Sequence, residues 1–419
     1  MSDVSSTISI PVSPDPGQHW QLRYWSVFLS QASSLIGSAL TQFVLLWWIA
    51  DTTGSVAALS LAGLFALLPQ ALLGPIGGAV ADRFSRRFLM IVADLVSAAC
   101  MLVLIVLFLT ERVELWHIYT MMFIRSAMQA FQTPAAAAST AMLVPQSFIG
   151  RAAGLNQTLH AMMLLSAAPL GALAISIMPI GFALAIDVAT ALLGVVPLLI
   201  FRIPQQRVPR EDRQGFGSEL REGFFTVWNN PGFRWLYLLM AFVLMATMPS
   251  YTLLPLLIKE HFGGGAPQVA LMEGLAGVGM LLGGLLATLF APKRRILWIL
   301  WGFSLSGFLM GLVGFAPGNM LWLAIAFWLI SSVVYVLGNA PMTALVQTTV
   351  PNHLQGRVLS LLTTVTALAA PIGLALATPI GDLIGIRWLF VVTGFSSGAI
   401  ALLGFLSKSV MTIEDHPLR

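Results

Sequence analysis

Apolar residues form long blocks along this chain, separated by short polar or Pro/Gly-marked stretches. Uncharged apolar runs of about 18 or more residues are typical of helices that cross a bilayer. The blocks are too long and too little alternating for the strands of a membrane barrel. The pattern therefore predicts an all-α integral membrane protein with twelve transmembrane helices. The predicted helices cover residues 26–50, 56–81, 88–110, 115–143, 152–179, 181–203, 233–258, 266–291, 295–316, 319–348, 354–381 and 386–407.

The second half of the chain repeats features of the first half. The octapeptide VPQSFIGR begins at Val144, and VPNHLQGR begins at Val350, which is 206 residues later. The segment GGAVADRFSRR at Gly77 has a weaker counterpart in GGLLATLFAPKRR at Gly283, and APLG is matched by APIG. A repeat of half the chain length indicates a duplicated structural unit. We expect two pseudo-symmetric six-helix bundles, with the octapeptides as equivalent loops after the fourth helix of each.

One long polar segment lies between the two repeats and suggests where the bundles meet. We place an N-terminal six-helix bundle at residues 1–204, an inter-bundle loop at residues 205–232 and a C-terminal six-helix bundle at residues 233–419. Within the loop, SELREGFFTVW is compatible with an amphipathic helix on the membrane surface or with a solvated tether. The sequence leaves both possibilities open.

Charge is scarce and unevenly placed. The chain is 58% hydrophobic and 9% charged, whereas soluble domains are about 25% charged. With a cytoplasmic N-terminus, all but four of the 21 Lys and Arg residues face the cytoplasm, as the positive-inside rule requires. We expect both termini in the cytoplasm and no cleaved leader, because the first 19 residues are polar. The basic excess thus reflects membrane topology and does not indicate binding to nucleic acid.

The predicted loop between the second and third helices reads GGAVADRFSRR, from Gly77 to Arg87. Its two glycines allow neighbouring helices to approach closely, and an acid stands among arginines at the membrane border. Positive-inside anchoring explains the arginines but explains neither the acid nor the glycine pair. The residues to which we assign a function are Gly78, Asp82, Arg83, Arg86 and Arg87.

This pattern, G-x-x-x-D-R-x-x-R-R, resembles the signature loop of the major facilitator superfamily. Ser85 stands where that family usually has glycine. The resemblance implies the major facilitator fold, in which the two six-helix halves are parallel repeats. It also implies that the loop acts as a conformational latch between the two halves.

The fourth predicted helix contains the segment FIRSAMQAFQTPA, which carries Arg125 and, one turn later, Gln129. An arginine inside an apolar helix is costly and marks a functional site by default. The segment is similar to the fourth-helix arginine motif of drug:proton antiporters, although the glycine that follows in that family is missing. Together with ADLVSAA, EHFGG, GMLLGGLL and GRVLSLL, it resembles the bacterial macrolide-efflux branch of these antiporters, which also includes siderophore exporters.

The resemblance implies a secondary active transporter of the bacterial inner (plasma) membrane that exports amphipathic, macrolide-like drugs by proton antiport and alternating access. Its partners would be a small amphipathic substrate, protons and the lipid bilayer, without nucleic acid. We expect it to work as a monomer, with the proton gradient as the energy source and with no cofactor or metal. Export of a siderophore or lipid-like metabolite, or a non-transporting receptor or scaffold, remains an alternative.

Motifs that would indicate an enzyme are missing from the sequence. It contains no H-E-x-x-H, no phosphate-binding G-x-x-x-x-G-K-[ST] and no paired cysteines, since Cys100 is the single cysteine. We therefore expect neither an enzyme nor a pump driven by nucleotide hydrolysis within this chain.

Few ionisable residues fall inside the predicted helices, and these are the candidates for proton coupling. Arg125 and Asp187 lie at similar depths, about 13 Å from the outer helix ends, so they can form an ion pair with a structural or a coupling role. Glu273 has no basic partner in the second half, which suits a group that loads and releases a proton; a water-exposed rim position is the alternative. Asp94 follows Arg86 on about the same helical face, which favours a structural brace to the loop over a coupling role.

Uncharged polar stripes are the candidates for the substrate cavity, because a polar stripe in a bilayer must face protein or water. Pairing between helices is the alternative. Methionine and aromatic side chains among neutral polar groups suit a large and variable amphipathic ligand. The predicted cavity residues are Gln31, Ser34, Ser38, Gln42, Gln129, Met245, Met248, Tyr251, Tyr335, Asn339 and Thr343.

Overall fold

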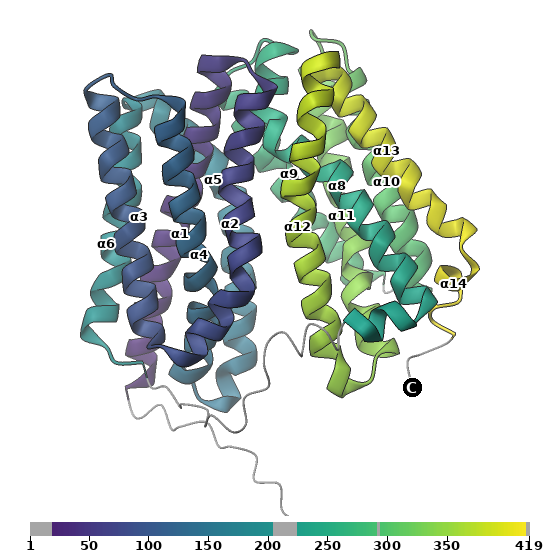
Figure 1. Cartoon of the computed structure of the whole chain (residues 1–419), viewed down its shortest axis with the longest axis horizontal. Coiled ribbons are helices and arrows are strands. Elements are labelled where there is room, and N and C mark those ends of the chain that lie inside the picture. Colours follow the sequence, from purple (N-terminus) through teal and green to yellow (C-terminus); the bar gives the residue numbers. More distant parts are fainter. Residues whose placement is uncertain (1–18, 204–223, 291–293, 416–419) are drawn as a thin grey trace, which may run out of the picture.

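The computed structural model describes residues 19–203, 224–290 and 294–415, and it is helical almost throughout (Figure 1). Each of the twelve predicted spans corresponds to one long helix among these residues. The helices are α1 (Trp20–Thr53), α2 (Val56–Arg83), α3 (Arg86–Leu109), α4 (Leu115–Leu143), α5 (Gln146–Ile177), α6 (Ile180–Ile200), α8 (Pro231–Glu260), α9 (Ala266–Leu289), α10 (Arg295–Phe315), α11 (Leu321–Thr349), α12 (Asn352–Ile384) and α13 (Ile386–Leu406), with a short α14 (Lys408–Met411). The predicted all-helical membrane fold is confirmed.

Eleven of the described helices are long and apolar enough to cross a membrane. The remaining long helix, α4, carries Arg125, Gln129 and Gln132, which lower its hydropathy. It nevertheless has 29 residues and packs against both α2 and α3. Arg125 contacts α6 and Gln132 contacts α1 and α3, so α4 is part of the same helix bundle.

The repeated octapeptides are mainly helical, which differs from the expectation that they form loops. Only the Val-Pro pair connects the helices, since α5 begins at Gln146 and α12 at Asn352. Pro145, with φ −66°, and Pro351, with φ −55°, stand at the N-caps of these helices. Both prolines have an extended ψ, 156° at Pro145 and 142° at Pro351, as is usual for an N-cap residue, and the helix starts at the next residue.

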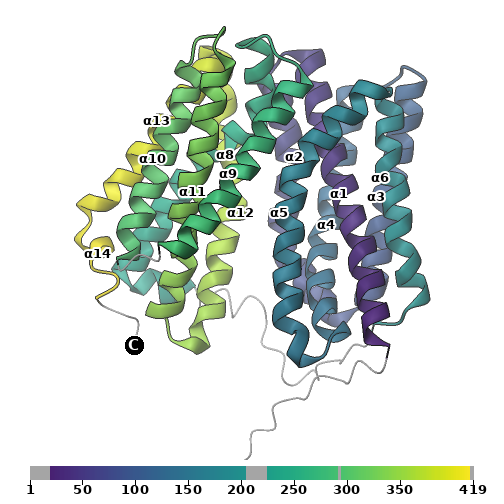
Figure 2. The same ribbon diagram turned by 180° about the vertical axis from the view of Figure 1, so that it is seen from behind.

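The two halves use the same helix packing, and they lie side by side (Figures 1 and 2). In the first half, α1 packs on α5 and α6, α2 on α4, and α3 on α4 and α6. In the second half, α8 packs on α12 and α13, α9 on α11, and α10 on α11 and α13. Between the halves, α2 packs on α12 and α5 on α9, which preserves the same pseudo-symmetry. The predicted domain limit after residue 204 and most of the predicted surface helix lie outside the described residues.

Matched glycines in the two repeats bring equivalent helices together. A Cβ atom added at Gly77 of α2 would lie 2.0 Å from the backbone oxygen of Ala130 in α4. A Cβ atom added at Gly283 of α9 would lie 2.5 Å from the backbone oxygen of Val333 in α11. The two helix backbones can approach this closely only because glycine has no side chain, as in other membrane helix pairs that cross at small residues.

The two halves share an apolar core at one end only, as far as the described residues show. At the end where α1 finishes and α2 begins, which we call the closed end, one cluster of buried side chains includes Leu45 of the first half and Leu257 of the second. At the opposite end, where α1 begins and α13 finishes, buried side chains form two separate clusters. One surrounds Tyr24 in the first half, and the other surrounds Phe233 in the second.

A polar contact also joins the halves at the closed end. Lys259 of α8 lies 3.2 Å from a carboxylate oxygen of Asp51, and it donates hydrogen bonds to the backbone oxygens of Ala50 and Asp51. A cation at the C-terminal carbonyls of a helix is favourable. Exposed ion pairs contribute only about 0–1 kcal/mol, and the Asp51 side chain is 55% exposed. The apolar cluster therefore supplies most of the contact between the halves.

The packing of Gly283 gives a direct test of the fold. Gly283→Val should destabilise the second half by about 1–3 kcal/mol or more, because the new side chain overlaps the backbone of α11. Gly284→Val is the matched control, since no atom lies within 4 Å of a Cβ atom placed at Gly284. The thermal midpoint and the monodisperse yield in detergent should fall for the first variant and not for the second. Equal behaviour of the two variants would contradict the described α9–α11 crossing.

Candidate functional site

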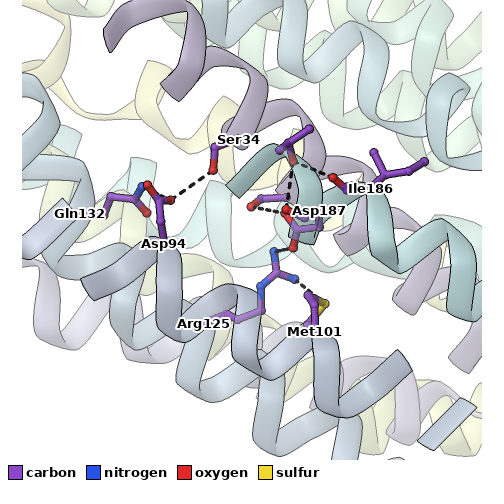
Figure 3. A network of polar contacts seen from close by, with 9 residues as sticks. Ser34, Asp94, Met101, Arg125, Gln132, Ile186 and Asp187 are labelled. Atoms are coloured by element: carbon purple, nitrogen blue, oxygen red, sulfur yellow. Dashed lines mark hydrogen bonds and ion pairs between the residues drawn. The ribbon is translucent and has the colours of Figure 1, made fainter. Parts of the chain in front are cut away.

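Asp94 of α3 is buried, with 3% of its surface exposed, and neutral side chains surround its carboxylate (Figure 3). Oδ2 accepts a hydrogen bond from Gln31 Nε2 at 3.1 Å. Oδ1 accepts hydrogen bonds from Ser34 Oγ at 3.2 Å and from Gln132 Nε2 at 2.7 Å. These donors come from α1 and α4, so Asp94 ties three helices together.

These partners differ from the predicted brace between Asp94 and the arginines of the α2–α3 loop. Asp94 lies eight residues beyond Arg86, which is about 12 Å along a helix. Arg86 donates instead to the backbone oxygens of Ala81, at 3.4 Å, and Ala138, at 3.1 Å. The two groups are therefore held at different levels of the bundle.

The predicted ion pair between Arg125 and Asp187 is confirmed (Figure 3). Arg125 Nη2 lies 2.8 Å from Asp187 Oδ2, and the two side chains are only 10% and 2% exposed. Ser38 Oγ of α1 donates to the other carboxylate oxygen at 2.9 Å. Arg125 Nη1 also contacts Met101 Sδ at 3.8 Å. The pair links α4 to α6 in the interior of the first half.

The polar stripe of α1 mainly serves the two buried acids, which corrects part of the predicted cavity. Ser34 and Ser38 point to Asp94 and Asp187, so the alternative of pairing between helices holds for both. Small residues allow this arrangement: a Cβ atom at Gly37 would lie 2.1 Å from Thr190 Oγ1, and one at Gly194 would lie 3.2 Å from the Cβ atom of Ser34. The close approach of α1 and α6 brings the hydroxyl groups within reach of the carboxylates.

A cavity of about 390 Å³ lies in the first half, between α1, α4 and α5. Gln31 and Gln129 line it as predicted, and Gln132, Gln70 and Asn156 line it without having been predicted. Gln132 could have been found, because it follows Gln129 by three residues and lies on the same face of the helix. The rest of the wall is largely apolar. Its apolar residues include Val27, Phe28, Leu35, Met90, Leu143 and Met163.

The other predicted cavity residues do not line this space. Tyr251 packs against Trp328 in a tilted arrangement, with ring centroids 5.1 Å apart, and Tyr335 packs edge-on against Phe303 at 5.4 Å. Asn339 is exposed on α11. Thr343 is also exposed, while Gln42, Met245 and Met248 are half-buried. A contact of these residues with substrate stays a prediction.

The α2–α3 loop holds together helix ends of the first half. Arg87 donates to the backbone oxygens of Leu198 and Leu199 at the end of α6, the latter at 2.7 Å. Gly78 has open space beside it, so of the glycine pair only Gly77 makes the predicted close approach. Arg83 is exposed. The side chain of Asp82 lies outside the described part of the structure, and the latch role of this loop stays a prediction.

Glu273 of α9 lies where the two halves meet. The next residue, Gly274, faces α5. A Cβ atom added at Gly274 would lie 3.4 Å from Cγ of Pro169 in α5. The Glu273 side chain is half-buried, and none of the hydrogen bonds or ion pairs found among the described residues involves it. It differs in this respect from Asp94 and Asp187.

The site offers no evident means of holding a metal. Within the described ranges, no group of three or more His, Cys, Asp or Glu side chains is placed to bind a metal ion. The arrangement instead provides an amphipathic cavity, with His160 among its lining residues, beside two buried and hydrogen-bonded acids.

Comparison with known proteins identifies the family. The sequence model of the Major Facilitator Superfamily matches residues 27–374. Macrolide efflux protein A of Streptococcus pyogenes is 32% identical over 379 residues, which cover 90% of this chain and 93% of that protein. Macrolide efflux protein A of Enterococcus faecalis is 33% identical over 324 residues, which cover 77% of this chain and all of that protein.

A solved structure supports the same fold. The chain resembles a bacterial homologue of the human lysosomal transporter Spinster, in an inward-facing and unoccupied conformation, with a TM-score of 0.67 and 15% identity. The match covers 95% of this chain and 98% of that one. With the family match and the sequence relatives in agreement, this chain is a multi-pass membrane transporter that belongs to the Major Facilitator Superfamily.

Proposed function

We propose that this chain exports macrolide-like amphipathic compounds by proton antiport and alternating access. The observation that carries the proposal is the uneven packing of the two halves. They share an apolar core at the closed end, while their cores are separate at the other end. A transporter that alternates must break one such contact and form another, so packing at a single end fits one of its two states.

The direction of opening follows from the distribution of charge. With α1 beginning in the cytoplasm, as the positive-inside rule favours, the closed end faces outward. The cavity, whose lining includes Tyr24 and Val27 near the start of α1, then lies toward the cytoplasm. The protein would take up substrate from inside the cell, in a bacterial inner membrane with both termini cytoplasmic.

The chemistry of the cavity and the names of the relatives support the choice of substrate. The wall combines apolar side chains with amides, hydroxyl groups and one histidine, His160, and no Asp, Glu, Lys or Arg is among its lining residues. Such a wall suits an uncharged or weakly charged amphiphile better than a small anionic nutrient, which would need convergent basic groups. Two relatives at 32–33% identity are macrolide efflux proteins.

Glu273 is our candidate for the group that carries the coupled proton. Asp187 is neutralised by Arg125 at 2.8 Å. Asp94 is surrounded by three donors. Glu273 has neither kind of partner among the described residues and lies at the α5–α9 contact between the halves. A carboxyl group in this position can load and release a proton as the contact opens and closes.

Export itself can be tested in cells that lack their own efflux pumps. Expression of this chain should raise resistance to macrolides and lower their accumulation, and collapse of the proton gradient should abolish the effect. Dyes and a siderophore should be tested in parallel. Export of the siderophore alone, or transport that depends on sodium and ignores the proton gradient, would contradict the proposal.

Exchange of the two acids for amides should separate coupling from structure. Glu273→Gln should preserve folding and macrolide binding but abolish uphill export, because the amide cannot release a proton. Asp187→Asn should lower the folded yield, because an uncompensated buried Arg125 costs about 3–5 kcal/mol. Arg125→Met combined with Asp187→Asn should recover much of that yield. Proton-driven accumulation in vesicles and yield in detergent are the measurements, and full uphill export by Glu273→Gln would remove the coupling role of Glu273.

A further inference from the structure

The hydrogen bonds around Asp94 fix which way the amide groups in the cavity wall point. Gln132 Nε2 uses its hydrogens for Asp94 Oδ1, at 2.7 Å, and for Gln31 Oε1, at 3.3 Å. Gln31 Nε2 in turn donates to Asp94 Oδ2 at 3.1 Å and to the backbone oxygen of Gly194 at 3.3 Å. Both amides therefore direct their NH₂ groups into this network.

The carboxylate of Asp94 dictates this orientation. An ionised carboxylate only accepts hydrogen bonds, so each glutamine must turn its NH₂ group toward Asp94. Gln31 Oε1 is then used by Gln132. Gln132 Oε1 receives no hydrogen bond from the residues described, and Gln132 lines the cavity. The network therefore leaves an acceptor oxygen for a ligand at this point of the wall.

The charges around the cavity favour a ligand with a positive charge. The ion pairs found in the described part of the chain join Arg125 to Asp187 and Lys259 to Asp51, and neither involves Asp94. In its ionised form Asp94 is thus stabilised by three neutral donors, and neither of these cations cancels its charge. Because a low dielectric strengthens electrostatic interactions, this charge favours a cation in the cavity next to it.

A second polar group close to the same cavity lacks a hydrogen-bond partner in the described part of the chain. Tyr24 lines the cavity and is 1% exposed. Its hydroxyl group is buried and has no hydrogen-bond partner among the described residues. A buried hydroxyl without a partner is costly, so a polar atom of a bound substrate would relieve that cost if the Tyr24 side chain turned toward the cavity.

We propose that Asp94 is a positioning residue for specificity: it orients the amide of Gln132 so that the cavity selects the protonated amine of an amphipathic substrate. The amine donates to Gln132 Oε1, with the negative charge of Asp94 behind that amide, and the apolar wall receives the adjoining carbon skeleton. A cavity of about 390 Å³ holds the basic end of a large amphiphile, and the remainder extends toward the second half. This proposal rests on the proposed export function and adds the substrate group that is recognised.

The test compares two ligands that differ in this group. Erythromycin carries a tertiary amine that is protonated at neutral pH, whereas erythromycin N-oxide is nearly the same size and is uncharged there. Equilibrium binding of radiolabelled erythromycin to the detergent-purified full chain at pH 7, with N-oxide as competitor, gives the ratio of the two affinities. A charge-assisted hydrogen bond predicts a preference of about tenfold or more for erythromycin.

Two variants separate this role from a structural one. Asp94→Asn removes the charge and lets Gln132 turn, so the affinity ratio should fall toward one, mainly through weaker binding of erythromycin. Gln132→Met leaves Asp94 in place but removes the acceptor, and it should also reduce the ratio. Asp382→Asn makes the same chemical change at an exposed position on α12 and should keep the wild-type ratio. Thermal midpoints show whether each variant is folded.

The outcomes distinguish this inference from the proposed export function. Equal affinity of the wild type for both ligands, or an unchanged ratio in folded Asp94→Asn and Gln132→Met, would overturn the inference and leave macrolide export in place. Binding of neither ligand by the wild type would overturn both. A ratio that falls in the two network variants and not in Asp382→Asn would support the inference.

Discussion

Buried carboxylates must be surrounded by hydrogen-bond donors or cations, and this requirement shapes the first half of the transporter. Asp94 draws α1 and α4 onto α3, and Asp187 draws α1 and α4 onto α6. The glycines of α1 and α6 make the approach possible, since Gly37 and Gly194 leave no room for side chains. The cavity lies beside this network, and its polar wall is partly made of the same side chains. The packing of the first half and the recognition that we propose thus depend on the same hydrogen bonds.

The second half repeats the packing of the first but not its chemistry. Its interior helix contacts use hydroxyl groups: Thr247 Oγ1 and Ser397 Oγ are 2.7 Å apart, and Ser306 Oγ and Ser331 Oγ are 2.9 Å apart. These pairs are neutral and need no compensating charge. Glu273 is the one acid of this half for which we propose a transport role, and it lies at the contact with the first half. The pseudo-symmetry is therefore architectural, while the cavity that we propose to bind substrate is lined by residues of the first half.

Much of the fold could be predicted from the sequence. The lengths of the apolar blocks and the repeat at half the chain length involve many residues, so a few atypical residues do not hide them. The pair Arg125–Asp187 could also be predicted, since equal depth in a bilayer restricts where charges can meet. The rotation of each helix could not. Gly77 and Gly78 look equivalent in the sequence, yet only Gly77 faces α4. Likewise, Ser34 fits a cavity stripe by its spacing, but it turns to Asp94 because α1 and α6 approach so closely.

The central claim is that the closed end opens when the other end closes. A pair of spin labels on Thr52 and Glu260 would report the distance between the halves at the closed end. A pair on Arg151 of α5 and Leu289 of α9 would report the distance at the opposite end. Cys100 would be replaced by serine so that only these positions are labelled. All four positions are exposed on their helices. Distances from pulsed electron paramagnetic resonance, measured in nanodiscs with and without erythromycin at two pH values, should change in opposite directions at the two ends. Distances that do not change, or that lengthen together at both ends, would contradict the account.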